Sequence, residues 1–426
     1  MAWHAVEFTS VPPEYPNTQF YDTAGPHLPL PGLDPPHRGV FDLPVSYPPA
    51  PAIASGCDKK NATLHAFHVT ADRGFLPRVD PVTTLPAAFS PLESLLQRLP
   101  IRRADGTPGL LASQSLIDAV FSELPDLSEE IDTHVADLPL MLALYRDYSF
   151  LATAFLFEPC FTRRRSNRHY GVARMMLPPC IARPLVKLAP FYSEGPTSPK
   201  PFMEHLGSLA LYNWLSTGGK SVAPIRWFED NRPGSWEAEY TSLYVNLYRK
   251  STGLMKWALE RLEEVLKEIN GLMKGMSRSP RGVHANVPDI WVSRIAKERP
   301  SFATFLLSLG SPGMFPCGVS YEGVREEAYF FTGENGAHDI LFATAAAVLQ
   351  IPTPSSADLP ELTADADFHA FRPGTHGKFL SWLSGAAAVF NVRSTAIADL
   401  CAADAYARCV DQVRSYQWRL WSVQKE

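Results

Sequence analysis

Apolar residues recur at every third or fourth position along most of the chain, and this spacing restricts the possible folds more than any other feature. The clearest case lies between residues 252 and 273, where one stripe contains Met255, Leu259, Leu262, Leu266, Ile269 and Met273. This period matches one face of an α-helix. The same spacing predicts further helices at 92–99, 115–124, 138–157, 203–214, 337–349, 378–390 and 402–426. Since strand patterns are scarce, the sequence predicts an all-α fold.

Prolines interrupt this pattern at the beginning of the chain. The sequence contains 39 prolines, and many of them precede Ala52. Runs such as Val11-Pro12-Pro13 cannot form a regular helix, because proline lacks the backbone N–H and restricts the residue before it. We therefore expect an extended Pro-rich arm over residues 1–54, a smaller helical domain over 55–225 and a larger helical domain over 226–426.

Charge and composition exclude several classes of protein. The net charge is -5, which argues against nucleic acid as the main partner. The most apolar segment, 139–157, carries Arg146 and Asp147 in its middle, so it is predicted to be a buried helix and not a membrane span. Six scattered cysteines without a C-x-x-C pair are typical of reduced thiols in the cytosol. The first residues lack a signal-peptide pattern, and we expect a cytoplasmic protein.

A glutamine interrupts the apolar stripe of the last predicted helix. Gln417 falls on the same face as the apolar residues Tyr406, Val410, Val413, Leu420 and Trp421. A polar side chain in such a stripe must find a hydrogen-bond partner or face a cavity. Two interpretations follow: Gln417 is a hydrogen-bonded core residue, or the stripe borders a pocket.

Several short segments resemble one known family in their order and spacing. They are Leu177-Pro178-Pro179-Cys180-Ile181-Ala182, Leu211-Tyr212-Asn213-Trp214, Tyr321-Glu322-Gly323, Gly333-Glu334-Asn335-Gly336-Ala337-His338, the run from Phe368 to Leu380 that contains Pro373 and His376, and Arg414-Ser415-Tyr416-Gln417. Together they resemble the indoleamine 2,3-dioxygenase superfamily from about residue 138 to residue 426. The resemblance implies a two-domain helical fold with a large cavity.

The last of these segments departs from the family at its most important position. The family has Arg-Ser-Tyr-His, and its histidine is the proximal ligand of heme iron, whereas this chain has Gln417. An amide is a poor ligand for heme iron, so we expect no heme and no other metal. If heme is bound after all, His376 or His369 is the alternative ligand. Thr304 stands where the family has the arginine that binds the substrate carboxylate, so tryptophan oxidation is not expected.

The resemblance also implies which residues line the cavity. Leu206, Leu209 and Ala210 match the wall distal to the heme, and Ser242 matches a pocket serine. Glu334 and Gly336 belong to the glycine-rich loop. Arg414 matches an arginine that contacts a heme propionate, so without heme it is expected to pair with a substrate acid or with a surface carboxylate.

A heme-sized apolar cavity without heme suits a bulky, mainly apolar small molecule. The sequence therefore predicts a cofactor-independent enzyme of natural-product biosynthesis, such as a cyclase or Diels–Alderase with a terpenoid or polyketide substrate. Candidate hydrogen-bond donors for such a reaction are Gln417, Ser242, Asn335 and His338. A binding protein without catalytic activity and a heme-dependent oxygenase are the alternatives.

Overall fold

The computed structural model describes residues 66–70, 73–167, 171–193, 211–218, 221–250, 252, 264, 266–268, 270–271, 314–330, 339–351 and 373–424. Contacts between residues divide the chain into the units Met1–Asp42 and Leu43–Glu426, and all described residues belong to the second. This part is mostly helical, as the sequence predicts. The predicted arm and most of the helix predicted at 252–273 lie outside the described residues, and the predicted boundary near residue 225 stays a prediction.

The first group of described helices surrounds one long buried helix. It consists of α1 (Ser90–Arg98), α2 (Leu110–Ser113), α3 (Leu116–Glu123), α4 (Ser128–Thr133), α5 (Leu138–Asn167) and α6 (Pro179–Ser193), and a short 3-10 turn at Ala87–Phe89 precedes α1. Within α5, the stretch Leu138–Arg163 is long and apolar enough to cross a membrane, but its most apolar window is fully buried in the protein. That burial is typical of a core helix, and it agrees with the sequence prediction for 139–157.

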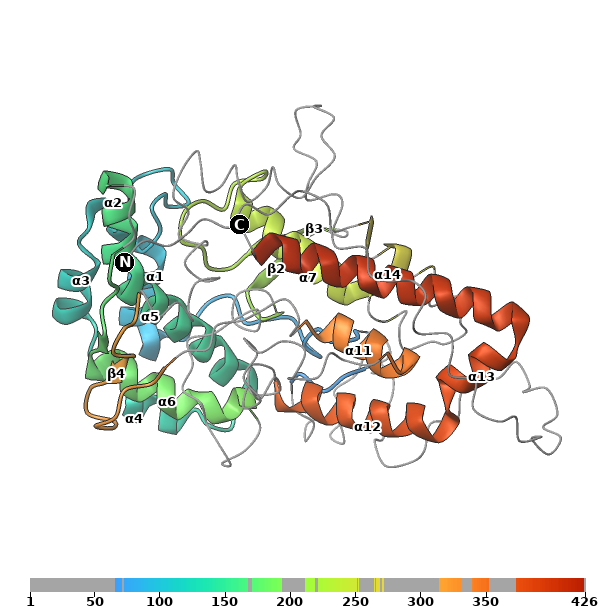
Figure 1. The fold of residues 1–426 in the computed structure, drawn as a ribbon. Coiled ribbons are helices and arrows are strands. Elements are labelled where there is room, and N and C mark those ends of the chain that lie inside the picture. Colours follow the sequence, from blue (N-terminus) through green and yellow to red (C-terminus); the bar gives the residue numbers. More distant parts are fainter. Residues whose placement is uncertain are drawn as a thin grey trace. The chain divides into compact units, whose positions relative to one another are not determined.

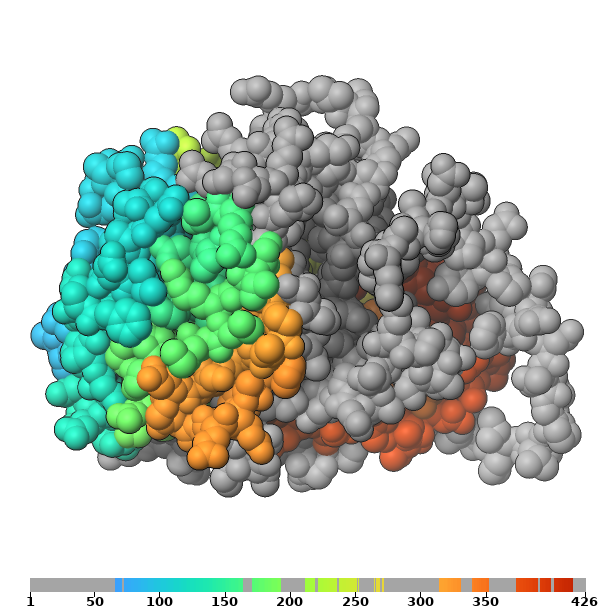
Figure 2. All heavy atoms as spheres, turned by 60° about the vertical axis from the view of Figure 1, so that its left-hand side comes forward, coloured from blue at the N-terminus to red at the C-terminus, as the bar shows by residue number. Residues whose placement is uncertain are grey.

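Two very short sheets accompany these helices. Strand β1 (Met176–Leu177) pairs in parallel with β4 (Ser320–Tyr321), which brings residues 314–330 against α5 and α6. Figure 2 shows this segment in orange beside the green helices. Strand β2 (Trp214–Gly218) pairs antiparallel with β3 (Ser221–Pro224), and β3 packs on α7 (Trp236–Lys250). The helix predicted to extend to Trp214 is therefore wrong at its end, because β2 begins there.

The second group of helices comes from the end of the chain. It consists of α11 (Ile340–Leu349), α12 (Gly374–Phe390), α13 (Val392–Ala398) and α14 (Leu400–Gln424). Helix α11 contacts both α12 and α14, and Figure 1 shows it between them. Eight of the ten residues of α11 are buried, so this helix is apolar on almost every side. Such a helix has to be enclosed by others, which explains its position.

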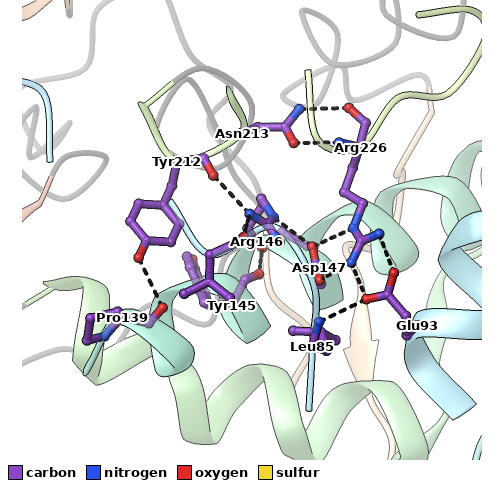
Figure 3. A network of polar contacts seen from close by, with 11 residues as sticks. Leu85, Glu93, Pro139, Tyr145, Arg146, Asp147, Tyr212, Asn213 and Arg226 are labelled. Carbon is purple, nitrogen blue, oxygen red and sulfur yellow. Dashed lines mark hydrogen bonds and ion pairs between the residues drawn. The ribbon is translucent and has the colours of Figure 1, made fainter. Parts of the chain in front are cut away.

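A network of buried charges joins α5 to α1 and to the segment before α7 (Figure 3). We call Glu93, Arg146, Asp147 and Arg226 the Arg146 network. Arg146 Nε donates to Asp147 Oδ1 over 2.7 Å, and Arg226 Nη2 donates to Asp147 Oδ2 over 2.8 Å. Arg226 also binds Glu93 with two hydrogen bonds of 3.0 and 2.7 Å. Each buried charge thus has an opposite charge beside it, which offsets much of the cost of its desolvation.

The same network fixes backbone segments that are far apart in the sequence. Arg146 Nη1 donates to the carbonyl oxygens of Val82, at 2.8 Å, and Tyr212, at 3.1 Å. The side chain of Asn213 exchanges two hydrogen bonds with the backbone of Arg226, of 2.7 and 2.8 Å. These hydrogen bonds therefore hold Tyr212 against α5 and Asn213 against the backbone of Arg226.

Candidate functional site

Polar groups meet at a buried point between three elements that are distant in the sequence. The side chain of Tyr416, on α14, interacts electrostatically with Asp339 at the beginning of α11 and with Tyr244 and Tyr248 on α7. We call these four residues the Tyr416 cluster. Tyr248, Asp339 and Tyr416 are each at most 3% exposed. The cluster lies beside positions 338 and 417, which are two of the candidate donors.

Asp339 is placed by the sequence signal for a helix start. It directly precedes the apolar run of α11, and its Oδ1 accepts hydrogen bonds from the backbone N–H groups of Leu341, at 2.8 Å, and Phe342, at 3.3 Å. An aspartate at this position satisfies backbone donors that the helix leaves open, and its negative charge is favourable at a helix N-terminus. These two hydrogen bonds therefore fix the position of the Asp339 carboxylate within the Tyr416 cluster.

Tyr416 is placed by the packing of α14 along α11. At the other end of α11, Tyr406 Oη donates a hydrogen bond of 2.6 Å to the carbonyl oxygen of Leu349. The separation of Tyr406 from Tyr416 equals that of Asp339 from Leu349, so the two helices run antiparallel with both ends matched. Asn270 adds a further restraint, because its Nδ2 donates to the backbone oxygen and to Oε1 of Gln412, each at 2.9 Å. The orientation of α14 up to Tyr416 is therefore fixed.

The phenol of Tyr416 lies beside the carboxylate of Asp339. Burial raises the pKa of the phenol well above its usual value, and the negative charge of Asp339 raises it further. Hydrogen bonding between the two side chains acts in the same direction. The neutral phenol therefore has a charged neighbour inside the core.

The tyrosines of α7 form one row, and Ser242 is not part of it. The ring centroids of Tyr240 and Tyr244 are 4.5 Å apart, and those of Tyr244 and Tyr248 are 6.3 Å apart. These residues follow one another at intervals of four and share a helix face. Ser242 is half-buried, and its Oγ is 3.4 Å from Nδ2 of Asn246. Because residues two apart on a helix do not face the same way, the structure does not bring Ser242 to the Tyr416 cluster.

Of the other candidate residues, the structure describes three. Gln417 lies in α14 directly after Tyr416, and only its place in the helix is described. Arg414 is exposed on α14, and its predicted role toward a substrate acid stays a prediction. His376 is 1% exposed on α12. The remaining candidates lie outside the described residues; they are Leu206, Leu209, Ala210, Thr304, Glu334, Asn335, Gly336, His338 and His369.

Position 417 does not offer the axial ligand that the family uses for heme iron. Position 417 is a glutamine, and an amide lacks the basic nitrogen that an axial ligand provides. His376 is packed in the core, where its ring meets the rings of Phe75 and Phe67 edge-on at centroid distances of 5.1 and 6.0 Å. No group of three His, Cys, Asp or Glu side chains within the described ranges could hold a metal ion. The expectation that the protein binds no heme stays a prediction.

Sequence reasoning missed Asp339 and Tyr416 as a pair. The sequence analysis singled out His338, which directly precedes Asp339, and Gln417, which directly follows Tyr416. Two local signals were present: an aspartate directly before an apolar helical run, and a tyrosine next to the glutamine of the last stripe. Only the packing of α11 on α14 shows that the two belong together.

The comparisons with known proteins add no closer relationship. No protein-family model matches the chain, and no curated protein shows significant similarity to it in sequence. The resemblance to the dioxygenases therefore depends on the short segments given above and on their order.

Proposed function

We propose that this protein is an enzyme of natural-product metabolism that works without heme and binds a bulky, mainly apolar substrate where the dioxygenases hold theirs. The fold in this proposal is a two-domain, indoleamine 2,3-dioxygenase-like arrangement of helices. The observation that supports it best is the Tyr416 cluster, since it places buried polar groups directly beside position 417. A few fixed polar groups within apolar walls are typical of sites for small molecules.

The reaction that such a site suits best is a cyclisation or a Diels–Alder-type addition within one substrate. An apolar pocket lowers the entropic barrier by holding the substrate in a reactive conformation. Hydrogen-bond donors on an activating carbonyl stabilise the charge that develops in the transition state. In this proposal Gln417 is the first donor, with Asn335, His338 and Ser242 as further candidates. The substrate is a terpenoid or polyketide, and neither a metal nor a redox partner takes part.

The first experiment tests the proposal that position 417 corresponds to the heme-binding histidine of the family. Hemin is added to the purified wild-type protein and to Gln417→His, and the Soret absorption is recorded. We expect no stoichiometric band for the wild type and a strong band for Gln417→His, because this substitution restores the family's Arg-Ser-Tyr-His run. Gln412→His is the matched control, because it puts the same side chain on α14 at a residue that binds Asn270.

The alternatives give different results in the same experiment. A stoichiometric Soret band in the wild type that His376→Ala or His369→Ala removes would contradict the proposal and support a heme-dependent oxygenase. The absence of a band in Gln417→His, with the variant folded, would contradict the dioxygenase-like cavity. A binding protein is distinguished from an enzyme by turnover: binding of a pathway intermediate without acceleration of its cyclisation would contradict the catalytic part.

A further inference from the structure

We propose that the outer face of α3 and α4 is a docking surface for a positively charged, amphipathic segment of another protein. This inference goes beyond the proposed catalytic function and does not depend on it. It begins from the distribution of charge along the chain. Residues 104–145 contain eight aspartates and glutamates but no lysine or arginine, whereas the net charge of the whole chain is -5. The negative charge of the protein is therefore concentrated in this segment, which includes α3 and α4.

Three acidic residues of this segment hold α3 and α4 against neighbouring helices. One ion pair joins the end of α3 to α1, and two join α4 and the residues before it to α6. The pairs are Glu123–Arg98, Asp126–Arg183 and Asp132–Lys187. These contacts fix the two helices on the side that faces the protein, so their remaining side chains have a defined orientation.

The other acidic side chains of the two helices are exposed. They are Asp118, Glu129 and Glu130, and none of them forms an ion pair within the part of the chain that the structure describes. Four residues separate α3 from α4, so these charges follow one another along the surface. A surface of this charge repels nucleic acids and anionic membranes, and it attracts segments rich in lysine or arginine.

Two large apolar side chains are exposed on the same segment. Phe121 is 63% exposed on α3, and it follows Asp118 by three residues, so the two share a face of the helix. Val135, two residues after α4, is 48% exposed. Exposed aromatic side chains are typical anchors of protein interfaces, whereas the charges around them select the partner. We call Asp118, Phe121, Glu129, Glu130 and Val135 the α3–α4 face.

The chemistry of the α3–α4 face defines the partner. A helix with apolar residues along one side would cover Phe121 and Val135, and lysines or arginines beside that stripe would meet Glu129 and Glu130. The ring of Phe121 is already restrained, because it meets the ring of Phe155 edge-on at a centroid distance of 6.3 Å. A restrained aromatic side chain loses little conformational freedom when a partner binds.

The segment 314–330 offers matched controls for both features of this face. Phe330 is 67% exposed, which is similar to Phe121. Glu326 and Glu327 are exposed and adjacent in sequence, as Glu129 and Glu130 are. Glu326→Lys/Glu327→Lys therefore changes the net charge by the same amount as Glu129→Lys/Glu130→Lys, at a different place on the protein.

The probe is a short fluorescein-labelled peptide of lysine and leucine, with the leucines spaced to line one face of a helix. Fluorescence anisotropy gives its affinity for the full chain at low and at high salt concentration. At low salt we expect Glu129→Lys/Glu130→Lys to weaken binding roughly tenfold and Phe121→Ser roughly three- to tenfold. Glu326→Lys/Glu327→Lys and Phe330→Ser should bind the peptide as the wild type does. Circular dichroism checks that every variant keeps its helices.

The proposal is overturned if the variants of the α3–α4 face bind the peptide as well as the wild type does. An equal loss in each variant and its control would also overturn it, because binding would then follow net charge or hydrophobicity alone. The same holds if the folded wild type does not bind the peptide at low salt. Sedimentation velocity tests the identity of the partner. A wild-type dimer that becomes a monomer in Glu129→Lys/Glu130→Lys would show that a second copy of the chain covers the face, and it would overturn the proposed partner.

Discussion

The Arg146 network and the Tyr416 cluster are both polar and both buried, but they differ in how their groups are satisfied. In the network each charge lies against an opposite charge, at distances between 2.7 and 3.1 Å. In the cluster a neutral phenol lies beside one carboxylate, and hydrogen bonding between them contributes to the raised pKa of the phenol. The first arrangement joins four charged groups, whereas the second joins one charge to a neutral group. We therefore expect substitutions in the network to lower stability more than substitutions in the cluster.

The largest effect is expected for Asp147→Ala. This substitution leaves Arg146 and Arg226 buried without their shared carboxylate, which should lower the free energy of unfolding by about 3–5 kcal/mol. Urea denaturation measures the change. The control is Asp80→Ala, whose ion pair with Arg73 is exposed and should be worth at most about 1 kcal/mol. Similar losses of unfolding free energy in the two variants would show that the buried network stabilises the fold no more than an exposed ion pair does.

A smaller effect with a clear pH dependence is expected for Glu93→Gln. Burial alone would raise the pKa of Glu93, but hydrogen bonds and the charge of Arg226 outweigh burial and hold the pKa below its usual value. The same balance, with Arg146 in addition, lowers the pKa of Asp147. A carboxyl group with a lowered pKa contributes stability above its unfolded pKa, near about 4.3 for glutamate, and loses it as the pH falls through the folded value.

At pH 7 the Glu93→Gln variant should therefore lose about 1.5–3 kcal/mol, the usual range for hydrogen bonds to charged groups. Unfolding free energies measured between about pH 7 and pH 3 should converge with those of the wild type at the acidic end. Parallel curves over this range would contradict the role assigned to the Glu93 charge.

A smaller loss of stability than in Glu93→Gln is expected for Tyr406→Phe, a substitution in the same helix as Tyr416. The hydroxyl of Tyr406 is well bonded to the carbonyl of Leu349, so its removal should cost about 1–2 kcal/mol. The melting temperature and the urea midpoint should both fall. No change in either would mean that this bond does not hold α14 on α11.

The comparison also separates what the sequence can predict from what it cannot. The periodicity of apolar residues predicted α5, α11, α12 and α14, because a helix with a buried face repeats that pattern in every turn. Burial of Arg146 and Asp147 followed from the long apolar segment around them. Their partners Glu93 and Arg226 did not follow, because long-range pairing leaves no local pattern.

Other differences have local causes. Helix α6 contains Pro184 and Pro190, which ordinarily argue against a helix, and it was not predicted. The end of the helix predicted at 203–214 was replaced by β2, since apolar residues before a tight hairpin resemble part of a helical stripe. At the candidate site, the sequence singled out position 417 and missed Tyr416 beside it. The meeting of Tyr416 with Asp339 depends on how α14 lies along α11.

The most direct test is the unfolding free energy of Tyr416→Phe, measured beside Asp147→Ala and Tyr148→Phe. Because the Tyr416 hydroxyl lies beside the Asp339 carboxylate, its removal should cost about 1.5–3 kcal/mol, the usual range for hydrogen bonds to charged groups and less than for Asp147→Ala. Tyr148→Phe should leave stability unchanged or raise it by up to about 1 kcal/mol, because the buried Tyr148 hydroxyl has no hydrogen-bond partner among the described residues. A loss in Tyr416→Phe as large as that in Asp147→Ala would contradict the distinction between the two regions.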